Sequence, residues 1–313
     1  MKNPQVKKED MRTKFLIFAM MFMCYSSFAQ QDAQYTQYMY NTININPAYA
    51  GSRGVMSIFG LHRTQWVGLD GAPVTNAFSL NTPFNESNLG LGVSFVNDKI
   101  GPTNENQISV DLSYSVQMSE DYKLSFGLKA TGNIFNLDVN KLNPADANDP
   151  NLQNFNSEFS PNFGAGLYLH SDKLYFGLSV PNFLQDTKYN DNDVSVFKER
   201  MNFYAIGGYV FDLSQNVKFK PAFLTKMVTG SPLQVDLSGN FMFFDKLVLG
   251  GAYRWDAAWS AMAGFQVTDG LYVGYGYDRE TTNLKNFNSG SHEVFLRFEL
   301  FNRVNKLVSP RFF

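Results

Sequence analysis

Three histidines are the first residues whose chemistry could define a site: His62, His170 and His292. Two histidines with Glu293 could bind a transition metal, and Ser57 or Ser291 beside a histidine could hydrolyse a lipid ester. No spacing singles out either arrangement, and ordinary polar residues near a protein rim are the favoured alternative. We therefore expect no catalytic, metal-binding or cofactor-binding residues, and no enzymatic activity.

Four charged residues form two pairs that only a sheet could bring together. In a hairpin that pairs Met118 with Tyr122, Asp111 lies opposite Lys129. In a hairpin that turns at Asp245, Asp236 lies opposite Arg254. Opposite charges on directly paired residues attract, so both pairs predict hairpins with a polar face. The formal net charge is only −2 and no basic cluster is present, so nothing indicates a nucleic-acid partner.

Alternation of apolar and polar residues predicts the strands that carry these pairs. Gln107–Met118 alternates without a break, and Tyr122–Thr131 repeats the pattern. Membrane-spanning strands need about 9–11 residues, which is longer than most strands of soluble proteins. We predict a closed antiparallel transmembrane β-barrel of about 14 strands, all-β in class, whose outward face contacts lipid. The candidate strands are 54–66, 73–82, 88–97, 107–118, 122–131, 160–170, 173–181, 201–212, 216–227, 232–244, 246–256, 257–267, 271–279 and 291–301.

Links between these strands alternate in length, as the short periplasmic turns and long outer loops of membrane barrels do. Short links are predicted at 119–121, 171–172, 213–215, 244–245 and 268–270, and longer ones at 98–105, 135–159, 182–200 and 279–290. Glycines also recur at predicted inward positions, for example Gly166 and Gly177. They either leave room for something inside the barrel or relieve strain in a curved wall.

The N-terminus predicts a secretory signal peptide over residues 1–29. Basic residues precede the apolar run Phe15–Tyr25, and Ser27-Phe28-Ala29 supplies the small residues of a cleavage site near Ala29. Either Met1 or Met11 could be the start. Cys24, the only cysteine, lies inside this segment. We divide the remainder into a plug or periplasmic segment at 30–53, the barrel at 54–301 and a short periplasmic tail at 302–313.

Apolar and polar residues do not alternate in residues 30–53, and this segment contains short sequence motifs that are similar to those of a known family. Later motifs are Asn97-Asp98-Lys99-Ile100-Gly101-Pro102, Val180-Pro181-Asn182-Phe183, Gly290-Ser291-His292-Glu293 and the ending Ser309-Pro310-Arg311-Phe312-Phe313. The ordered set resembles the PorP/SprF family of outer-membrane proteins of the type IX secretion system of Bacteroidetes. The family-motif residues in the first part of the chain are Gln37, Tyr38, Met39, Asn41, Asn46, Pro47, Ala48, Tyr49, Gly51, His62, Arg63, Gln65 and Trp66.

The resemblance implies a non-enzymatic protein of the outer membrane of a Gram-negative bacterium. Family members support export or surface retention of a secreted adhesin or other cargo with a C-terminal sorting domain, in some species within gliding motility. Further implied partners are periplasmic and outer-membrane components of the secretion system. A channel or transporter for a small or hydrophobic solute is the alternative function, because the predicted inward face carries both signs of charge.

Two segments are expected to serve these roles. Residues 30–53 should fold into or under the barrel and restrict the pore, because their aromatic side chains should not stay in water; docking onto a periplasmic ring protein is the alternative. The cargo surface is expected on outer loops 135–159 and 182–200. In the first loop, apolar residues either anchor a partner or pack back onto the barrel mouth: Phe135, Leu142, Leu152 and Phe155.

Overall fold

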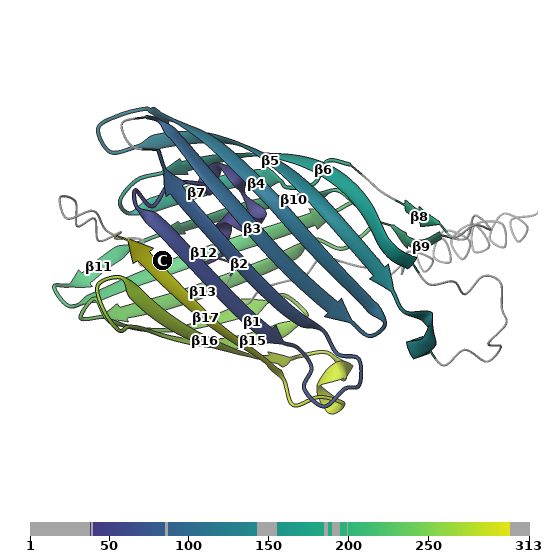
Figure 1. The fold of residues 1–313 in the computed structure, drawn as a ribbon. Helices are drawn as coiled ribbons and strands as arrows, with labels where there is room; N and C mark the ends of the chain where they lie inside the picture. The colour runs from purple at the N-terminus through teal and green to yellow at the C-terminus, as the bar shows by residue number, and fades with distance from the viewer. Residues whose placement is uncertain are drawn as a thin grey trace, which may run out of the picture.

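A continuous ladder of antiparallel strands closes the chain into a barrel in the computed structural model (Figure 1). The structure describes residues 38, 40–84, 87–142, 155–184, 187–189, 195–198 and 200–300. The wall strands are β1 Met56–Thr64, β2 Val74–Pro83, β3 Leu89–Ile100, β4 Thr103–Gln117, β5 Lys123–Leu137, β6 Phe155–His170, β7 Leu174–Val180, β10 Asn202–Tyr209, β11 Phe211–Ser214, β12 Val217–Val228, β13 Gln234–Phe243, β14 Leu247–Arg254, β15 Ala258–Gln266, β16 Leu271–Glu280 and β17 Ser291–Leu300.

Closure occurs where the first and last strands meet. Strand β1 pairs with β17 over its whole length, with Ile58 opposite Phe298, and β10 pairs with both β7 and β12. The short strand β11 follows β10 after one residue and pairs with the same neighbour, β12, so 14 strands make the wall. The predicted 14-strand barrel is confirmed. A closed wall leaves no unpaired edge strand, which is the arrangement that a sheet inside lipid requires.

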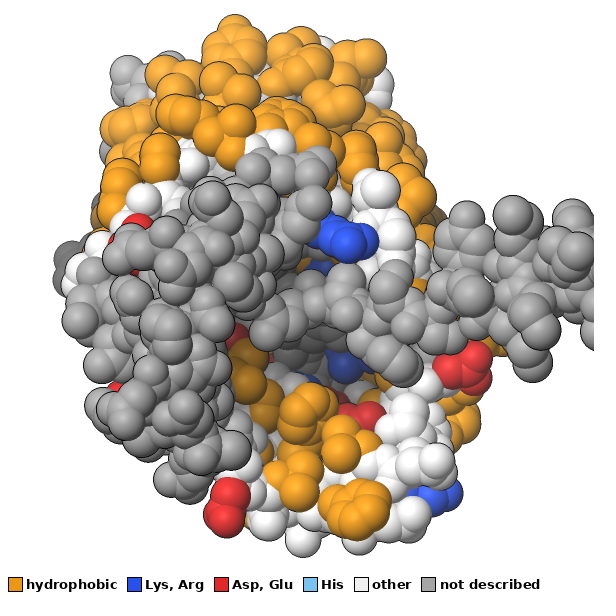
Figure 2. All heavy atoms as spheres, turned by 90° about the vertical axis from the view of Figure 1, so that its right-hand side faces the viewer, with side chains coloured by type: hydrophobic (Ala, Val, Ile, Leu, Met, Phe, Trp, Pro, Cys, Tyr) orange, Lys and Arg blue, Asp and Glu red, His pale blue; other side chains and the backbone are white. Residues whose placement is uncertain are grey.

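Apolar and polar side chains lie on opposite faces of the wall, as the alternation in the sequence predicted. The outward face is hydrophobic, and the end-on view shows this coat over the upper part of the barrel and charged side chains within the opening (Figure 2). Apolar side chains at outward positions of the wall are exposed, among them Leu112, Tyr114, Phe126, Leu128, Leu237, Phe241, Leu296 and Phe298. Within the described residues, no helix is both long enough and apolar enough to span a bilayer.

The connections between strands also fall into short and long ones, with one correction to the predicted links. The link between β3 and β4 is a tight turn at Gly101-Pro102, where Gly101 has φ 54°, and not the longer loop predicted over 98–105. The strands continue through Asn97 and Asn104, where polar residues no longer alternate with apolar ones. Alternation is enforced only where one face contacts lipid, so a strand that continues into water loses its sequence signature.

The remaining elements lie inside the barrel or at its loop end. Helix α2 Thr42–Ile45 and the 3₁₀ turn η1 Pro47–Tyr49 precede β1 and lie within the barrel. At the end with the longer connections are η2 Val139–Leu142, the hairpin of β8 Thr187–Tyr189 and β9 Ser195–Lys198, and η3 Asn283–Asn286 (Figure 1).

Candidate functional site

The segment before β1 fills part of the barrel interior, and we call its described residues, 38 and 40–54, the plug. Its largest side chains are almost fully buried: Tyr38, Tyr40 and Tyr49 keep 4%, 6% and 6% of their surface, and Ile43 keeps 1%. Within the described part of the chain, these side chains cluster with inward residues of the barrel wall. The plug therefore packs as a core would, with the wall as its partner.

Asn46 fixes the bend at the centre of the plug. Its side-chain oxygen accepts a hydrogen bond from the Ala48 backbone N–H at 3.0 Å, so it caps the turn η1. Pro47, at the first position of that turn, has the fixed φ that the turn needs. The Asn46 amide nitrogen donates to the Leu167 carbonyl of β6 at 2.9 Å. One asparagine thus shapes the turn and ties it to the wall.

The plug lies across one row of small residues that runs through five neighbouring strands. In the pairing of β3 to β7, each member is directly opposite the next: Gly90, Ser113, Gly127, Gly166 and Ser179. We call this row the seat. All five residues face inward and are buried. The plug residues from Ile45 to Ala50 follow the seat from its Ser179 end to its Gly90 end.

Backbone carbonyls of the plug accept hydrogen bonds from the two serines of the seat. The Ser179 hydroxyl donates to the Ile45 carbonyl at 2.6 Å, and the Ser113 hydroxyl donates to the Ala50 carbonyl at 2.7 Å. These bonds satisfy plug carbonyls that are buried away from water. The plug is therefore held through its backbone, in the middle and at its end.

The seat glycines leave no room for any side chain. A Cβ on Gly127 would lie 2.1 Å from the Ala48 backbone nitrogen, and a Cβ on Gly166 would lie 2.1 Å from the Asn46 side-chain oxygen. On Gly90 it would lie 2.3 Å from the Ala50 carbonyl oxygen. Of the two explanations offered for inward glycines, room for an internal segment accounts for these positions. Gly90 and Gly127 were missed by sequence reasoning, because their common row appears only once five strands are in register.

The predicted charge pair Asp111–Lys129 lies one inward position beyond the seat. The two residues are directly opposite in the β4–β5 ladder, and the Lys129 Nζ lies 3.1 Å from Asp111 Oδ1. The same ammonium donates to the Ile43 carbonyl at 3.2 Å. Both side chains are nearly fully buried. The pair therefore binds the plug as well as joining two strands.

The opposite wall holds the plug through rings and ion pairs. The Tyr40 hydroxyl lies 3.0 Å from the Tyr272 hydroxyl, and the centroid of the Tyr40 ring lies 4.5 Å from that of the Phe295 ring. At the end of the plug, Arg53 pairs with Glu299 of β17, which also lies 3.4 Å from Arg297. The plug is thus attached on both sides of the barrel.

The second predicted charge pair and the motif around Arg63 lie elsewhere on the inner wall. Arg254 Nε lies 2.9 Å from Asp236 Oδ1, with the two residues directly opposite. Arg63 forms ion pairs with Asp278 at 2.7 Å and Glu293 at 3.1 Å, all three nearly fully buried. This triad joins β1, β16 and β17 across the seam where the barrel closes.

The other motif residues form the connection after β1. The Gln65 backbone N–H donates to the Pro73 carbonyl, and the Trp66 indole N–H donates to Glu280 at 3.0 Å. Trp66 adopts φ 46°, a backbone conformation that non-glycine residues rarely take outside tight turns. Gly51 has φ 70° where the chain leaves the seat. Gln37 and Met39 lie outside the described residues.

The histidines do not assemble with Glu293. His62 and His292 are on the outward face and bond to Asn76 and Tyr275, whereas Glu293 is fully buried on the inward face. His170 is buried on the inward face beside Tyr168. No group of metal-binding side chains occurs among the residues that the structure describes.

The expected cargo loop is described only in part. Phe135 is 3% exposed and clusters with Leu137 and Val139, so at this position the side chain packs onto the barrel. Leu142 ends η2 and Phe155 begins β6, but their side chains, and Leu152 altogether, lie outside the described part of the chain. The role of this loop stays a prediction.

Replacing Asn46 with alanine should loosen the plug without unfolding the barrel. The change removes two hydrogen bonds of about 1 kcal/mol each and leaves the Leu167 carbonyl without that donor. A reporter cysteine at Asn44, in a Cys24→Ser background, should then react with maleimide about tenfold to a hundredfold faster. Asn76→Ala, which removes an outward hydrogen bond to His62, is the control. Equal labelling rates for both variants would show that Asn46 does not hold the plug.

Comparison with known proteins identifies the family. The model of the family described as type IX secretion system membrane protein PorP/SprF matches residues 27–298, which include the plug and nearly the whole barrel. Among curated proteins, none matches the chain significantly.

Several solved structures are similar in outline. The CymD monoaromatic hydrocarbon channel is 13% identical with a TM-score of 0.47, covering 86% of this chain and 94% of its own. The P. putida toluene transporter TodX is 8% identical with a TM-score of 0.46, covering 84% and 95%. The KdgM porin in complex with disordered oligogalacturonate is 12% identical with a TM-score of 0.40, covering 78% and 99%. On the family match, this chain belongs to the PorP/SprF family of type IX secretion system membrane proteins.

Proposed function

We propose that this outer-membrane barrel supports the export or surface retention of a partner adhesin, or of other cargo with a C-terminal sorting domain. In a gliding species the same role would supply adhesins for motility. The observation that carries the proposal is the family match over residues 27–298, which covers the plug and the wall together. The protein acts by binding, without catalysis or a cofactor.

The presence of the plug favours a role in binding cargo over a role as a channel through which cargo passes. Its backbone follows five strands of one wall, and its rings and Arg53 reach the opposite wall. A cargo polypeptide could pass this lumen only after all of these contacts had broken. Cargo therefore contacts the loops at the outer end, while machine components contact the short-turn end.

Affinity purification from the native outer membrane tests this function. A tagged chromosomal copy should co-purify with a cargo protein that carries a C-terminal sorting domain, and deletion of the gene should remove that cargo from the cell surface. Co-purification with none of the secretion components, together with normal cargo display in the deletion strain, would contradict the proposal.

Shortening the loop over 143–154 to a tight turn locates the cargo surface. We expect cargo retention to fall at least tenfold while the barrel stays heat-modifiable on gels, because a hairpin needs only a few residues to close. The matched control replaces residues 283–286, in another connection at the same end, with glycine and serine. Normal export and retention in the loop variant would exclude this loop as the cargo site.

A further inference from the structure

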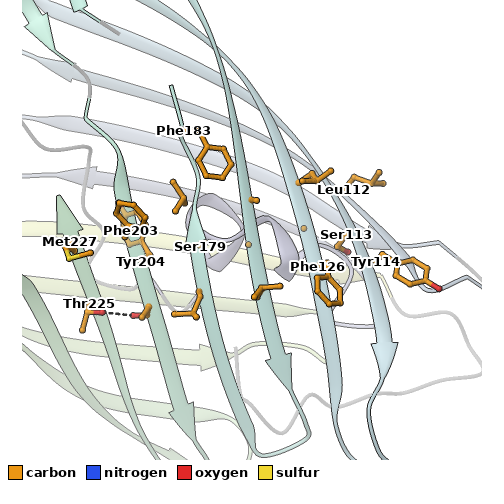
Figure 3. Close-up of a pocket in the computed structure, with 18 of the residues that line it drawn as sticks. Leu112, Ser113, Tyr114, Phe126, Ser179, Phe183, Phe203, Tyr204, Thr225 and Met227 are labelled. Atoms are coloured by element: carbon orange, nitrogen blue, oxygen red, sulfur yellow. Dashed lines mark hydrogen bonds between the residues drawn. The ribbon is translucent and has the colours of Figure 1, made fainter. Parts of the chain in front are cut away.

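An apolar groove lies on the outside of the wall directly behind the plug. It spans strands β3 to β7 with β10 and β12, and has a volume of about 830 Å³. Figure 3 shows its lining, with Leu112 and Phe126 at one side, Phe203 and Met227 at the other, and the plug coil behind the strands. The groove therefore belongs to the lipid-facing surface of the barrel.

The groove and the plug share one thin piece of wall. Four seat residues, Ser113, Gly127, Gly166 and Ser179, line the groove although their side-chain positions face inward. Glycine lets the wall backbone approach the plug closely, since a Cβ at Gly127 or Gly166 would lie 2.1 Å from a plug atom. On the outward side, backbone atoms at these glycines therefore form the floor of the groove, and larger side chains of neighbouring residues form its walls.

A short strand widens the groove at the loop end. Strand β7 has seven residues, and its pairing with β6 ends at Ala165 opposite Val180. The chain then turns inward, because a Cβ on Gly164, which faces the lumen, would lie 2.1 Å from the Pro181 carbonyl oxygen. Strand β6 continues well past this point, whereas β10 extends only one residue beyond it.

The side chains that line the groove favour a hydrocarbon ligand. Among the described residues that line the groove, none is charged. Its exposed walls are large apolar side chains, with Leu112 47%, Leu128 65% and Leu178 45% exposed. The two floor hydroxyls donate to plug carbonyls, and the Thr225 hydroxyl is directed at the Ala205 carbonyl, so they face away from a ligand.

We propose that this groove binds one acyl chain of an outer-membrane lipid. The groove is continuous with the lipid-facing band of the barrel, so acyl chains are the molecules that surround it. An acyl chain inserted in the groove covers the apolar residues of its floor and walls, which lipid tails that lie along the outer surface of the barrel cannot reach. Packing of this kind holds a lipid longer than the convex wall elsewhere does. The proposal rests on the fold and does not depend on the secretion role.

Filling the groove tests the proposal. Ala165 lies in its centre and faces outward, so Ala165→Phe should occupy it without touching the plug. Ala261→Phe makes the same change on the exposed face of β15, outside the groove. Native mass spectrometry of protein released from outer-membrane lipid nanodiscs should show one retained lipid fewer for Ala165→Phe than for wild type. Ala261→Phe should match wild type.

A second arm identifies the occupant directly. Photoactivation of p-benzoylphenylalanine at Leu128, in membranes of the native host, should add the mass of a lipid to the protein. Ala205→Phe, another outward change in the groove, replaces Ala165→Phe if that variant does not assemble. Equal lipid retention by wild type and the filled variant would overturn the proposal. A cross-link to a polypeptide at residue 128 would also overturn it.

Discussion

Gly127→Ala is expected to expel the plug from its seat. The added Cβ would lie 2.1 Å from the Ala48 backbone nitrogen and 2.5 Å from the Ala48 Cα, and neither backbone atom can move alone. Overpacking of this kind typically costs about 1–3 kcal/mol, and in this protein the plug can relieve it by leaving the seat. The reporter cysteine at Asn44 should therefore be labelled with maleimide at close to the rate of an unfolded chain.

Two controls isolate the seat. Gly60→Ala adds the same methyl group where nothing lies within 4 Å, so it should change neither labelling nor stability. In a background that lacks residues 38–50, Gly127→Ala should cost no stability in urea unfolding, because its clash partner is gone. If Gly127→Ala were equally destabilising with and without the plug, the close approach at the seat would be refuted.

Arg63→Met is expected to be the most destabilising single change in the wall. It removes the cation that forms ion pairs with both Asp278 and Glu293, and two nearly fully buried carboxylates then lose this shared partner. Removing one partner of a buried ion pair typically costs about 3–5 kcal/mol. The triad joins β1 to β16 and β17, so the loss should fall on the seam that closes the barrel. Urea unfolding of the protein in lipid vesicles measures this change.

The partner variants give the comparison. Asp278→Asn leaves Arg63 paired with Glu293, so it should destabilise the barrel less than Arg63→Met. Combined with Arg63→Met, Asp278→Asn should recover part of the loss because one buried charge is removed. Arg279→Met, which removes hydrogen bonds to backbone carbonyls in the β16–β17 connection, should have a small effect. A loss below about 1 kcal/mol for Arg63→Met would mean that lumen water solvates these carboxylates.

Within the lipid-spanning part of the wall, the sequence was sufficient to predict the fold. Lipid on one side forces strict alternation, so Gln107–Met118 revealed its strand and its inward Asp111. The pairing of Asp111 with Lys129 followed from one short turn, and the structure has the same register. Where both faces meet water, as at Asn104 and Asn106, the pattern is lost and the strand ends were misplaced.

The candidate site was harder to predict because it depends on several strands at once. The motif around Asn46 was recognisable, and its burial could be expected from its tyrosines. Its partners could not be found, because a row such as Gly90, Ser113 and Gly127 requires the registers of two hairpins together. An error of one residue in any strand turns its side chains to the other face. The triad at Arg63 was missed for the same reason, since it depends on how the first and last strands meet.

Conductance in planar lipid bilayers tests the plugged barrel most directly. Wild-type protein should give almost no current, since the plug contacts both walls of the lumen. A variant that lacks residues 38–50, with the barrel shown to be heat-modifiable, should give discrete channel openings. Equal conductance of the two proteins would contradict the account, because the plug would then not close the lumen and the solute-channel function would take the place of the binding role.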